Sequence, residues 1–245
     1  MRGFARTVPA AWLALTAALA PGSSLAGQML DIPAQHDNTL FQSVTGDVSD
    51  GAGPVFFAGT SGTSVRRALL RFDVAGALPA GAVITDASVI ILLAFSPSGS
   101  GPIMGLYRVL HDWGEGSSST ASIAGAPATT GDASWLYTFY PGASWSTPGG
   151  DFVATTSSAH GVAGFGGFHA WEGGTLAADV QSWLDDPAHN YGWLMKGDEI
   201  NANTARTFAS REDANAINRP RLRVVYDAPI AIRASSWSRL KRLYR

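Results

Sequence analysis

Cysteine is absent from the 245 residues, so the chain has no disulfide bonds and no thiol chemistry. The sequence also lacks a Gly-x-Ser-x-Gly elbow, a His-Glu-x-x-His motif, a phosphate-binding loop and a dinucleotide fingerprint. Each of these absences removes a common class of enzyme from consideration. A domain of this length folds without disulfides, so the lack of cysteine is compatible with export.

The apolar stretch near the N-terminus, Ala10–Ala20, is only eleven residues long. A helix needs about 20 apolar residues to span a bilayer, which argues against a membrane anchor. The stretch follows Arg2 and Arg6 and precedes the small residues of Ser24–Ala26. This order is typical of a secretory signal peptide, here residues 1–26. We therefore expect a secreted protein, located outside the cell, at its surface or in the periplasm.

Charge is distributed unevenly along the remaining chain. Residues 27–228 carry ten basic and 19 acidic side chains, a net charge of −9, whereas residues 229–245 carry five basic residues and no acidic one. An acidic body argues against nucleic acid as a partner and permits cations and neutral glycans.

Short runs rich in Val, Ile, Leu, Phe and Tyr alternate with glycine-rich turns along residues 27–228. Such a pattern predicts a single all-β domain, either a sandwich or a barrel. The predicted strands are His36–Val44, Val55–Ala58, Arg66–Val74, Val83–Phe95, Ile103–Leu110, Asp151–Thr155, Gly192–Lys196, Arg206–Ser210 and Leu222–Asp227. We expect Val89–Phe95 to be buried on both faces, because it is apolar throughout.

One segment has a helical period instead. Leu176, Val180, Trp183 and Leu184 recur at spacings of three and four, which predicts one short helix. Thr175 is the expected N-cap, and the chain reaches Pro187 shortly after the last apolar position. We expect this helix to cover an open end or edge of the β-structure.

Several phrases occur in a fixed order along the body. They are Arg67-Ala-Leu-Leu-Arg-Phe-Asp73, Leu78-Pro-Ala-Gly-Ala82, Ile84-Thr-Asp-Ala87, Tyr107-Arg-Val109, Asp112-Trp-Gly-Glu-Gly116, Gly131-Asp-Ala-Ser-Trp135, Pro148-Gly-Gly-Asp151, Asp179-Val-Gln-Ser-Trp-Leu184, Asn190-Tyr-Gly-Trp-Leu194, Phe208-Ala-Ser-Arg-Glu212 and Arg219-Pro-Arg-Leu222. In this order they resemble the DNRLRE-domain family of secreted bacterial and archaeal proteins, some of which are classed with carbohydrate-binding module family 96. The resemblance covers about His36 to Asp227. It implies a jelly-roll-like antiparallel β-sandwich and an extracellular role.

Aromatic residues in or near loops are the candidate ligand-binding residues. Sugars present apolar faces that stack on aromatic rings and hydroxyls that bind planar polar groups. The long loop Gly114–Gly150 holds most of these aromatics. The candidates are Trp135, Tyr137, Tyr140, Trp145 and Trp171, with packing as the alternative role for each. Trp113, Trp183 and Trp193 are expected to pack.

Two groups of charged residues could each serve either a structural or a ligand-binding role. Asp47 and Asp50 lie on a Gly/Asp loop that suits structural calcium, near Asp31 and Asp37, although Asp and Gly also form ordinary turns. Arg211 and Glu212 are expected to form a structural ion pair, and the alternative is that Arg211 binds a sugar carboxylate.

Catalysis is the least favoured functional hypothesis for this sequence. A glycosidase needs paired carboxyls and a lyase needs a base, but no pattern brings such residues together here. The residues considered are Glu115, Glu172, Glu199, Glu212, His111, His160, His169 and Tyr140.

The C-terminal residues 229–245 form a basic tail with apolar positions at Trp237, Leu240, Leu243 and Tyr244. This pattern predicts either an amphipathic segment that contacts a membrane surface or a sorting partner, or a disordered end. The leading prediction for the whole chain is a secreted, non-catalytic carbohydrate-binding or cell-surface module. A structural surface or matrix protein attached through the tail is the alternative, and a polysaccharide lyase or hydrolase is the third.

Overall fold

A computed structural model describes residues 27–229, which form an antiparallel β-sandwich with a short covering helix, as the sequence predicts. The predicted signal peptide (1–26) and nearly all of the predicted tail (229–245) lie outside the described residues. Between residues 27 and 229, no helix combines the length and apolarity needed to cross a membrane.

The strands are β1 (Gln28–Phe41), β2 (Val48–Ser49), β3 (Val55–Ser61), β4 (Ser64–Phe72), β5 (Val83–Phe95), β6 (Ile103–Arg108), β7 (Ala126–Pro127), β8 (Tyr137–Phe139), β9 (Ala143–Ser144), β10 (Ser158–Gly161), β11 (Gly167–Glu172), β12 (Trp193–Lys196), β13 (Arg206–Ala209) and β14 (Arg221–Asp227). The helices are α1 (Val74–Ala77), α2 (Leu176–Asp185) and the 3₁₀ turns η1 (Pro187–His189) and η2 (Ala216–Asn218).

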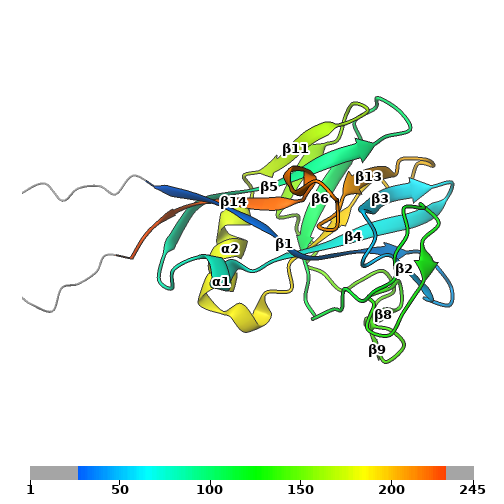
Figure 1. Cartoon of the computed structure of the whole chain (residues 1–245), viewed down its shortest axis with the longest axis horizontal. Coiled ribbons are helices and arrows are strands. Elements are labelled where there is room, and N and C mark those ends of the chain that lie inside the picture. Colours follow the sequence, from blue (N-terminus) through cyan, green and yellow to red (C-terminus); the bar gives the residue numbers. More distant parts are fainter. Residues whose placement is uncertain (1–26, 230–245) are drawn as a thin grey trace, which may run out of the picture.

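Two sheets face each other across the sandwich (Figure 1). One contains the first half of β1, β14, β5, β11, β13 and the start of β3. The other contains the second half of β1, β4, β12, β6 and β10. Strand β1 changes sheets at a bulge between Ala34 and His36, and β3 also pairs with both sheets. These shared strands close two edges that would otherwise expose unpaired backbone groups.

The main core lies between the two sheets. It forms because successive side chains along each strand point to opposite faces of the sheet. Ala68, Leu70 and Phe72 of β4 point inward, whereas Leu69 between them points to the opposite face. Strand β5 is buried continuously from Ala87 to Ile91, so the predicted burial on both faces is confirmed for Val89–Ile91. It is wrong for the end of the apolar run, where Phe95 is 60% exposed.

Helix α2 buries Leu176, Val180, Trp183 and Leu184 on one face, so the predicted helix is confirmed. Thr175 occupies the N-cap position, but its side chain makes no capping hydrogen bond. The Gln181 side chain accepts from Ile84 N at 2.8 Å, which fixes the helix where β5 begins.

The loop that joins β6 to β10 forms a third layer on the outer face of the second sheet. Leu40, Leu69 and Leu194 point outward from their strands and meet apolar residues of this loop. The loop residues in this second core are Val109, Trp113, Ala133, Trp135 and Trp145. A segment predicted to be an open loop is therefore packed against the sandwich.

Eight of the nine predicted strands overlap observed ones, and Val83–Phe95 has the predicted bounds. The strand predicted at Asp151–Thr155 is wrong, because only an isolated bridge between Val109 and Phe152 occurs there. The sequence also missed β10 and β11, which are short and contain glycine and histidine in place of β-branched residues. Their pairing with β6 and β5 makes them strands.

Candidate functional site

The predicted aromatic platform does not form at its tryptophans. Trp171 is fully buried in the main core, where its indole N–H donates to Met104 O at 2.7 Å. Trp145 and Trp135 are 6% and 8% exposed and belong to the second core. An indole buried to this extent cannot stack on a sugar, so these three residues pack the fold, which was the alternative considered for each.

The two tyrosines of the same set lie together and remain half-buried. Tyr137 and Tyr140 meet edge to face, with their ring centroids 5.2 Å apart. Their hairpin, β8 and β9, stands at the margin of the third layer (Figure 1).

The two predicted calcium ligands are not in the same environment. Asp47 is exposed and accepts hydrogen bonds from Ser43 and Thr45, as in an ordinary turn. Asp50 is 1% exposed, and one of its oxygens accepts from Thr120 N at 2.9 Å. The loop therefore does not present the two carboxylates as one ligand set.

The residues considered for catalysis are dispersed among separate contacts. Glu199 pairs with Arg67 and Lys196, and His111 approaches Asp151 at 3.8 Å. His160 and His169 contact each other at 3.0 Å between ring nitrogens, on the neighbouring strands β10 and β11. Glu115 and Glu212 also come close together, in a cluster described below.

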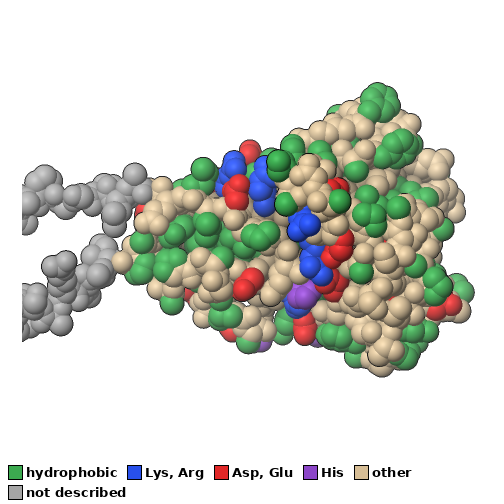
Figure 2. All heavy atoms as spheres, viewed as in Figure 1, with side chains coloured by type: hydrophobic (Ala, Val, Ile, Leu, Met, Phe, Trp, Pro, Cys, Tyr) green, Lys and Arg blue, Asp and Glu red, His purple; other side chains and the backbone are tan. Residues whose placement is uncertain are grey.

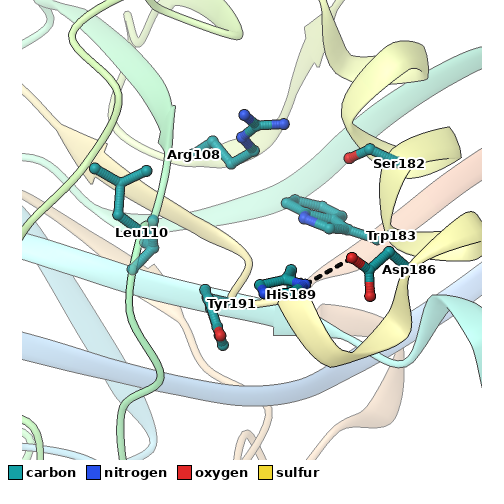
Figure 3. Close-up of a pocket in the computed structure, with 8 residues that line it drawn as sticks. Arg108, Leu110, Ser182, Trp183, Asp186, His189 and Tyr191 are labelled. Carbon is teal, nitrogen blue, oxygen red and sulfur yellow. Dashed lines mark hydrogen bonds and ion pairs between the residues drawn. The ribbon is translucent and has the colours of Figure 1, made fainter.

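A pocket of about 310 Å³ lies between the end of β6 and the C-terminal end of α2 (Figure 3). Strand β6 ends at Arg108 and the chain continues through Leu110, which together form one wall. Trp183 and Ser182 of α2 form the facing wall. The turn after α2 adds Asp186, His189 and Tyr191.

Short contacts hold the pocket residues in place. The His189 ring donates from Nδ1 to Asp186 Oδ2 at 2.6 Å, and it packs edge-on against Tyr191. The backbone carbonyl of Tyr191 accepts from the Trp113 indole at 2.8 Å, which ties this turn to the second core.

Arg108 is the pocket residue with unused binding capacity. Within the described part of the chain, its guanidinium makes no hydrogen bond, and the nearest carboxylate oxygen, on Asp179, is 4.0 Å away. The Asp179 carboxylate instead accepts from the indole N–H of Trp193 at 3.0 Å. The side chain of Arg108 is 41% exposed, so its donors are available to a ligand.

No local pattern in the sequence predicts this pocket. Arg108, Trp183 and Tyr191 belong to phrases that carry the family resemblance, whereas His189 lies in none of them. The pocket forms only when β6, α2 and η1 meet, so their separation along the chain concealed it.

A second cluster of charged groups surrounds Arg211, where β1 changes sheets. The Arg211 guanidinium binds both oxygens of Glu115, at 2.5 and 2.6 Å, and contacts Glu212 at 2.9 Å. The predicted ion pair of Arg211 with Glu212 is therefore present, with Glu115 as an additional partner. His36 Nδ1 lies 3.1 Å from Glu115, and the Arg211 backbone N–H donates to Asp37 at 2.7 Å.

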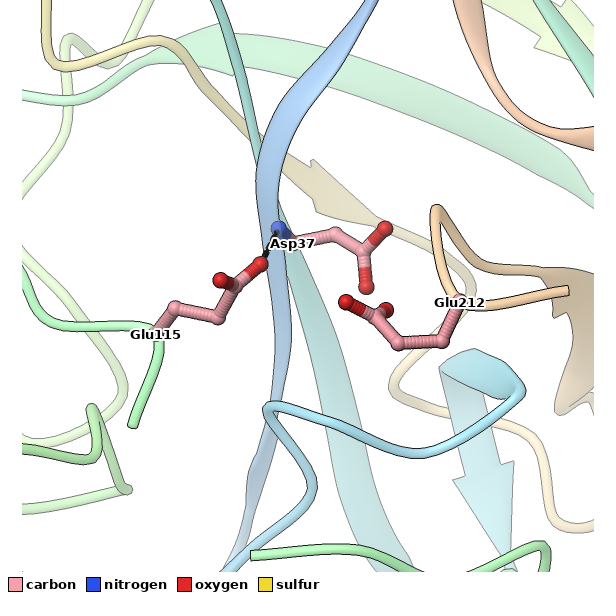
Figure 4. A group of neighbouring side chains, drawn as sticks. All are labelled: Asp37, Glu115 and Glu212. Atoms are coloured by element: carbon pink, nitrogen blue, oxygen red, sulfur yellow. Dashed lines mark hydrogen bonds between the residues drawn. The ribbon is translucent and has the colours of Figure 1, made fainter. Parts of the chain in front are cut away.

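The environments of these carboxyl groups shift their pKa values in different directions. Burial raises the pKa of Asp37 well above its ordinary value, and burial also raises the pKa of Glu212. Glu115 is the exception, because hydrogen bonds from His36, Arg211 and Asp37 N outweigh its burial and lower its pKa. Of these three carboxyl groups (Figure 4), only Glu115 has surroundings that favour its charged form.

Figure 2 shows that charged side chains gather in a band across the middle of this face. Ion pairs between Asp31 of β1 and the neighbouring Arg221 and Arg223 of β14 lie on the first sheet.

Comparison with known proteins adds no assignment, because no family model and no curated protein matches the chain.

Proposed function

We propose that this protein is a secreted, non-catalytic carbohydrate-binding module and that the pocket between β6 and α2 holds the sugar. The observation that carries the proposal is the uncommitted guanidinium of Arg108 beside the half-buried ring of Tyr191. Trp183 is buried and only supports the pocket wall. Sugar binding combines apolar contact with directed hydrogen bonds, and this pocket offers both. Its volume lies at the lower end of the range for small-ligand sites.

The polar groups of the pocket favour a particular kind of sugar. Arg108 presents a planar array of donors that suits hydroxyl pairs and, with greater strength, a carboxylate. Asp186 and His189 are more than half exposed at the rim, where they can bind hydroxyls. A polysaccharide that contains uronic acid residues is therefore the preferred ligand class. The resemblance of the sequence to DNRLRE domains is consistent with an extracellular glycan as the ligand.

The test is binding of the purified protein to an array of neutral and uronic polysaccharides, with the wild type compared with Arg108→Gln. We expect saturable binding of at least one uronic polysaccharide and at least a tenfold loss of affinity in Arg108→Gln. Arg223→Gln is the matched control, because it removes an exposed arginine from the other sheet and leaves the pocket intact.

The outcome of the array decides between the two non-enzymatic functions. Binding that is equal in wild type and Arg108→Gln would place the sugar elsewhere. A folded protein that binds no polysaccharide on the array would overturn the proposal and favour a structural surface protein attached through residues 229–245.

A further inference from the structure

A second pocket, of about 290 Å³, adjoins the pocket between β6 and α2, which is called the first pocket below. The turn after α2 contributes to both of them. Asp186 and His189 line the first pocket (Figure 3), whereas Pro187 and Asn190 line the second. Tyr191 lines both pockets, so they meet at its side chain.

Arg71 of β4 lines the second pocket and has donors to spare. Its Nη1 donates to Asp112 Oδ1 at 2.7 Å, and its guanidinium lies 5.3 Å from the ring centre of Trp113. Elsewhere in the fold, Arg67 uses Nε and Nη2 together to bind both oxygens of Glu199. The same two atoms of Arg71 donate to no group within residues 27–229, and Nε is buried.

The second pocket also has unused acceptors. Asn190 Nδ2 donates to Phe72 O at 2.8 Å, which fixes the amide, but Asn190 Oδ1 is buried without a partner in the described part of the chain. The carboxylates of Asp73 and Asp112 line the same pocket. Buried polar groups without partners destabilise a fold, so a ligand group that both donates and accepts would stabilise this one. A hydroxyl is such a group.

The charge of the second pocket selects against an acidic ligand. Its lining includes one arginine and two aspartates, a formal net charge of −1, and Arg71 is already paired with Asp112. A further carboxylate would meet like charge there, which weakens binding. In the first pocket, by contrast, Arg108 has no carboxylate oxygen nearer than 4.0 Å among the described residues. The first pocket therefore suits an acidic sugar unit and the second a neutral one.

We propose that the second pocket binds a neutral sugar unit of the same glycan whose uronic acid unit occupies the first pocket. This inference rests on the proposed function and narrows its ligand to chains in which uronic and neutral units are neighbours. Arg71 and Asn190 bind hydroxyls of the neutral unit, and the ring of Tyr191 contacts the chain between the two units. Because the units are linked, filling both pockets strengthens binding beyond either pocket alone.

The test is titration calorimetry of the purified protein with oligosaccharides of equal length. Hyaluronan and glucuronoxylan fragments contain both uronic and neutral units and are the mixed probes. Oligogalacturonate contains uronic units only, and xylo-oligosaccharides contain neutral units only. We expect at least one mixed probe to bind about tenfold more tightly than either uniform probe, since only a mixed probe fills both pockets.

Arg71→Gln tests the contribution of the second pocket. It should weaken binding of the mixed probe about tenfold, the effect of losing a hydrogen bond from a charged group. Binding of oligogalacturonate should stay unchanged, because that probe uses the first pocket only. Arg223→Gln is the matched control, since it changes an ion-paired arginine on the other sheet, and it should leave both affinities as they are.

Asp112→Asn provides a second measurement in case Arg71→Gln fails to fold. The asparagine keeps an oxygen for the bond to Arg71 and removes one negative charge from the pocket. The affinity for oligogalacturonate should therefore rise relative to that for the mixed probe. An unchanged ratio of the two affinities would contradict the assignment of a neutral unit to this pocket.

Two further results would overturn the inference. One is equal affinity of the wild type for mixed and uniform probes, and the other is an Arg71→Gln variant that binds the mixed probe as the wild type does. If Arg108→Gln still loses affinity in either case, the sugar-binding function stands and only the second pocket is excluded. Absence of binding to every probe would overturn the proposed function together with this inference.

Discussion

The indole of Trp193 shows how single residues serve this fold. It donates to Asp179 at 3.0 Å and packs edge-on against Trp183, with a centroid separation of 4.4 Å. All three side chains are buried or nearly so. A carboxylate in such a place is stable only while its donors remain, so the tryptophan is a hydrogen-bond donor as well as a packing residue.

Trp193→Phe should therefore destabilise the protein through a lost donor as well as lost volume. We expect the free energy of unfolding, measured in urea, to fall by about 1–3 kcal/mol more than it falls in the control variant. Trp135→Phe is the control, because among the described residues the Trp135 indole N–H has no hydrogen-bond partner. Equal losses in the two variants would show that the bond to Asp179 contributes nothing.

His169 should make stability depend on pH. Burial and the nearby His160 lower the pKa of His169, so the folded state binds fewer protons than the unfolded state. Stability is then complete above the ordinary histidine pKa of about 6.5 and decreases as the pH falls through that value. His169→Gln should reduce this decrease in Tm between pH 8 and pH 5. An unchanged pH profile would contradict the prediction.

At the scale of secondary-structure elements, the entry into β12 depends on one glycine. Gly192 has φ +74°, and a Cβ built there would lie 2.0 Å from Leu70 O of β4. Its carbonyl also accepts from Val109 N at 3.0 Å, beside the pocket. The close approach of β12 to β4 thus requires a residue without a side chain.

Gly192→Ala should cost about 3 kcal/mol, from backbone strain together with the clash against β4. Gly62→Ala is the matched control, because Gly62 also has a positive φ but nothing lies within 4 Å of its added Cβ. The control should cost about 1 kcal/mol, from strain alone. Denaturant unfolding of both variants would measure the difference, and equal losses would exclude the clash.

At the scale of the whole molecule, the loop between β6 and β10 is held by its own apolar core. Trp145 is central to it, since its indole donates to Ser134 O at 2.9 Å while its ring packs in the second core. The main core lies on the opposite face of the second sheet. The two cores share a sheet but consist of different residues.

Trp145→Ala should loosen the third layer before the sandwich itself. Truncation of a buried tryptophan destabilises a protein by about 3–5 kcal/mol. Because Trp145 packs in the second core, we expect this loss to weaken the packing of the loop. Limited proteolysis should cut within residues 114–150 at protease concentrations that leave the wild type intact. Leu222→Ala in the main core is the comparison, and it should give cleavage throughout the chain. Cleavage of Trp145→Ala throughout the chain would show that the layers unfold together.

The sequence by itself determined the features that depend on local patterns. Short runs rich in Val, Ile, Leu, Phe and Tyr between glycine-rich turns predicted most strands, and the spacing of Leu176, Val180 and Trp183 predicted α2. Continuous apolarity predicted the burial of Val89–Ile91 in β5. Adjacency in the chain also predicted the ion pair between Arg211 and Glu212. Each of these follows from the period of a strand or helix or from neighbouring residues, which one segment is enough to reveal.

Only the tertiary structure decided where distant residues meet. Trp135 and Trp145 had the composition of a binding platform, but the outward-facing leucines of β1, β4 and β12 bury them. Arg108 and Tyr191 form a pocket because β6 pairs with β12 beside α2. Glu115 reaches Arg211 across 96 positions in the chain. Burial and long-range pairing depend on the packing of whole sheets, so no local pattern could have shown them.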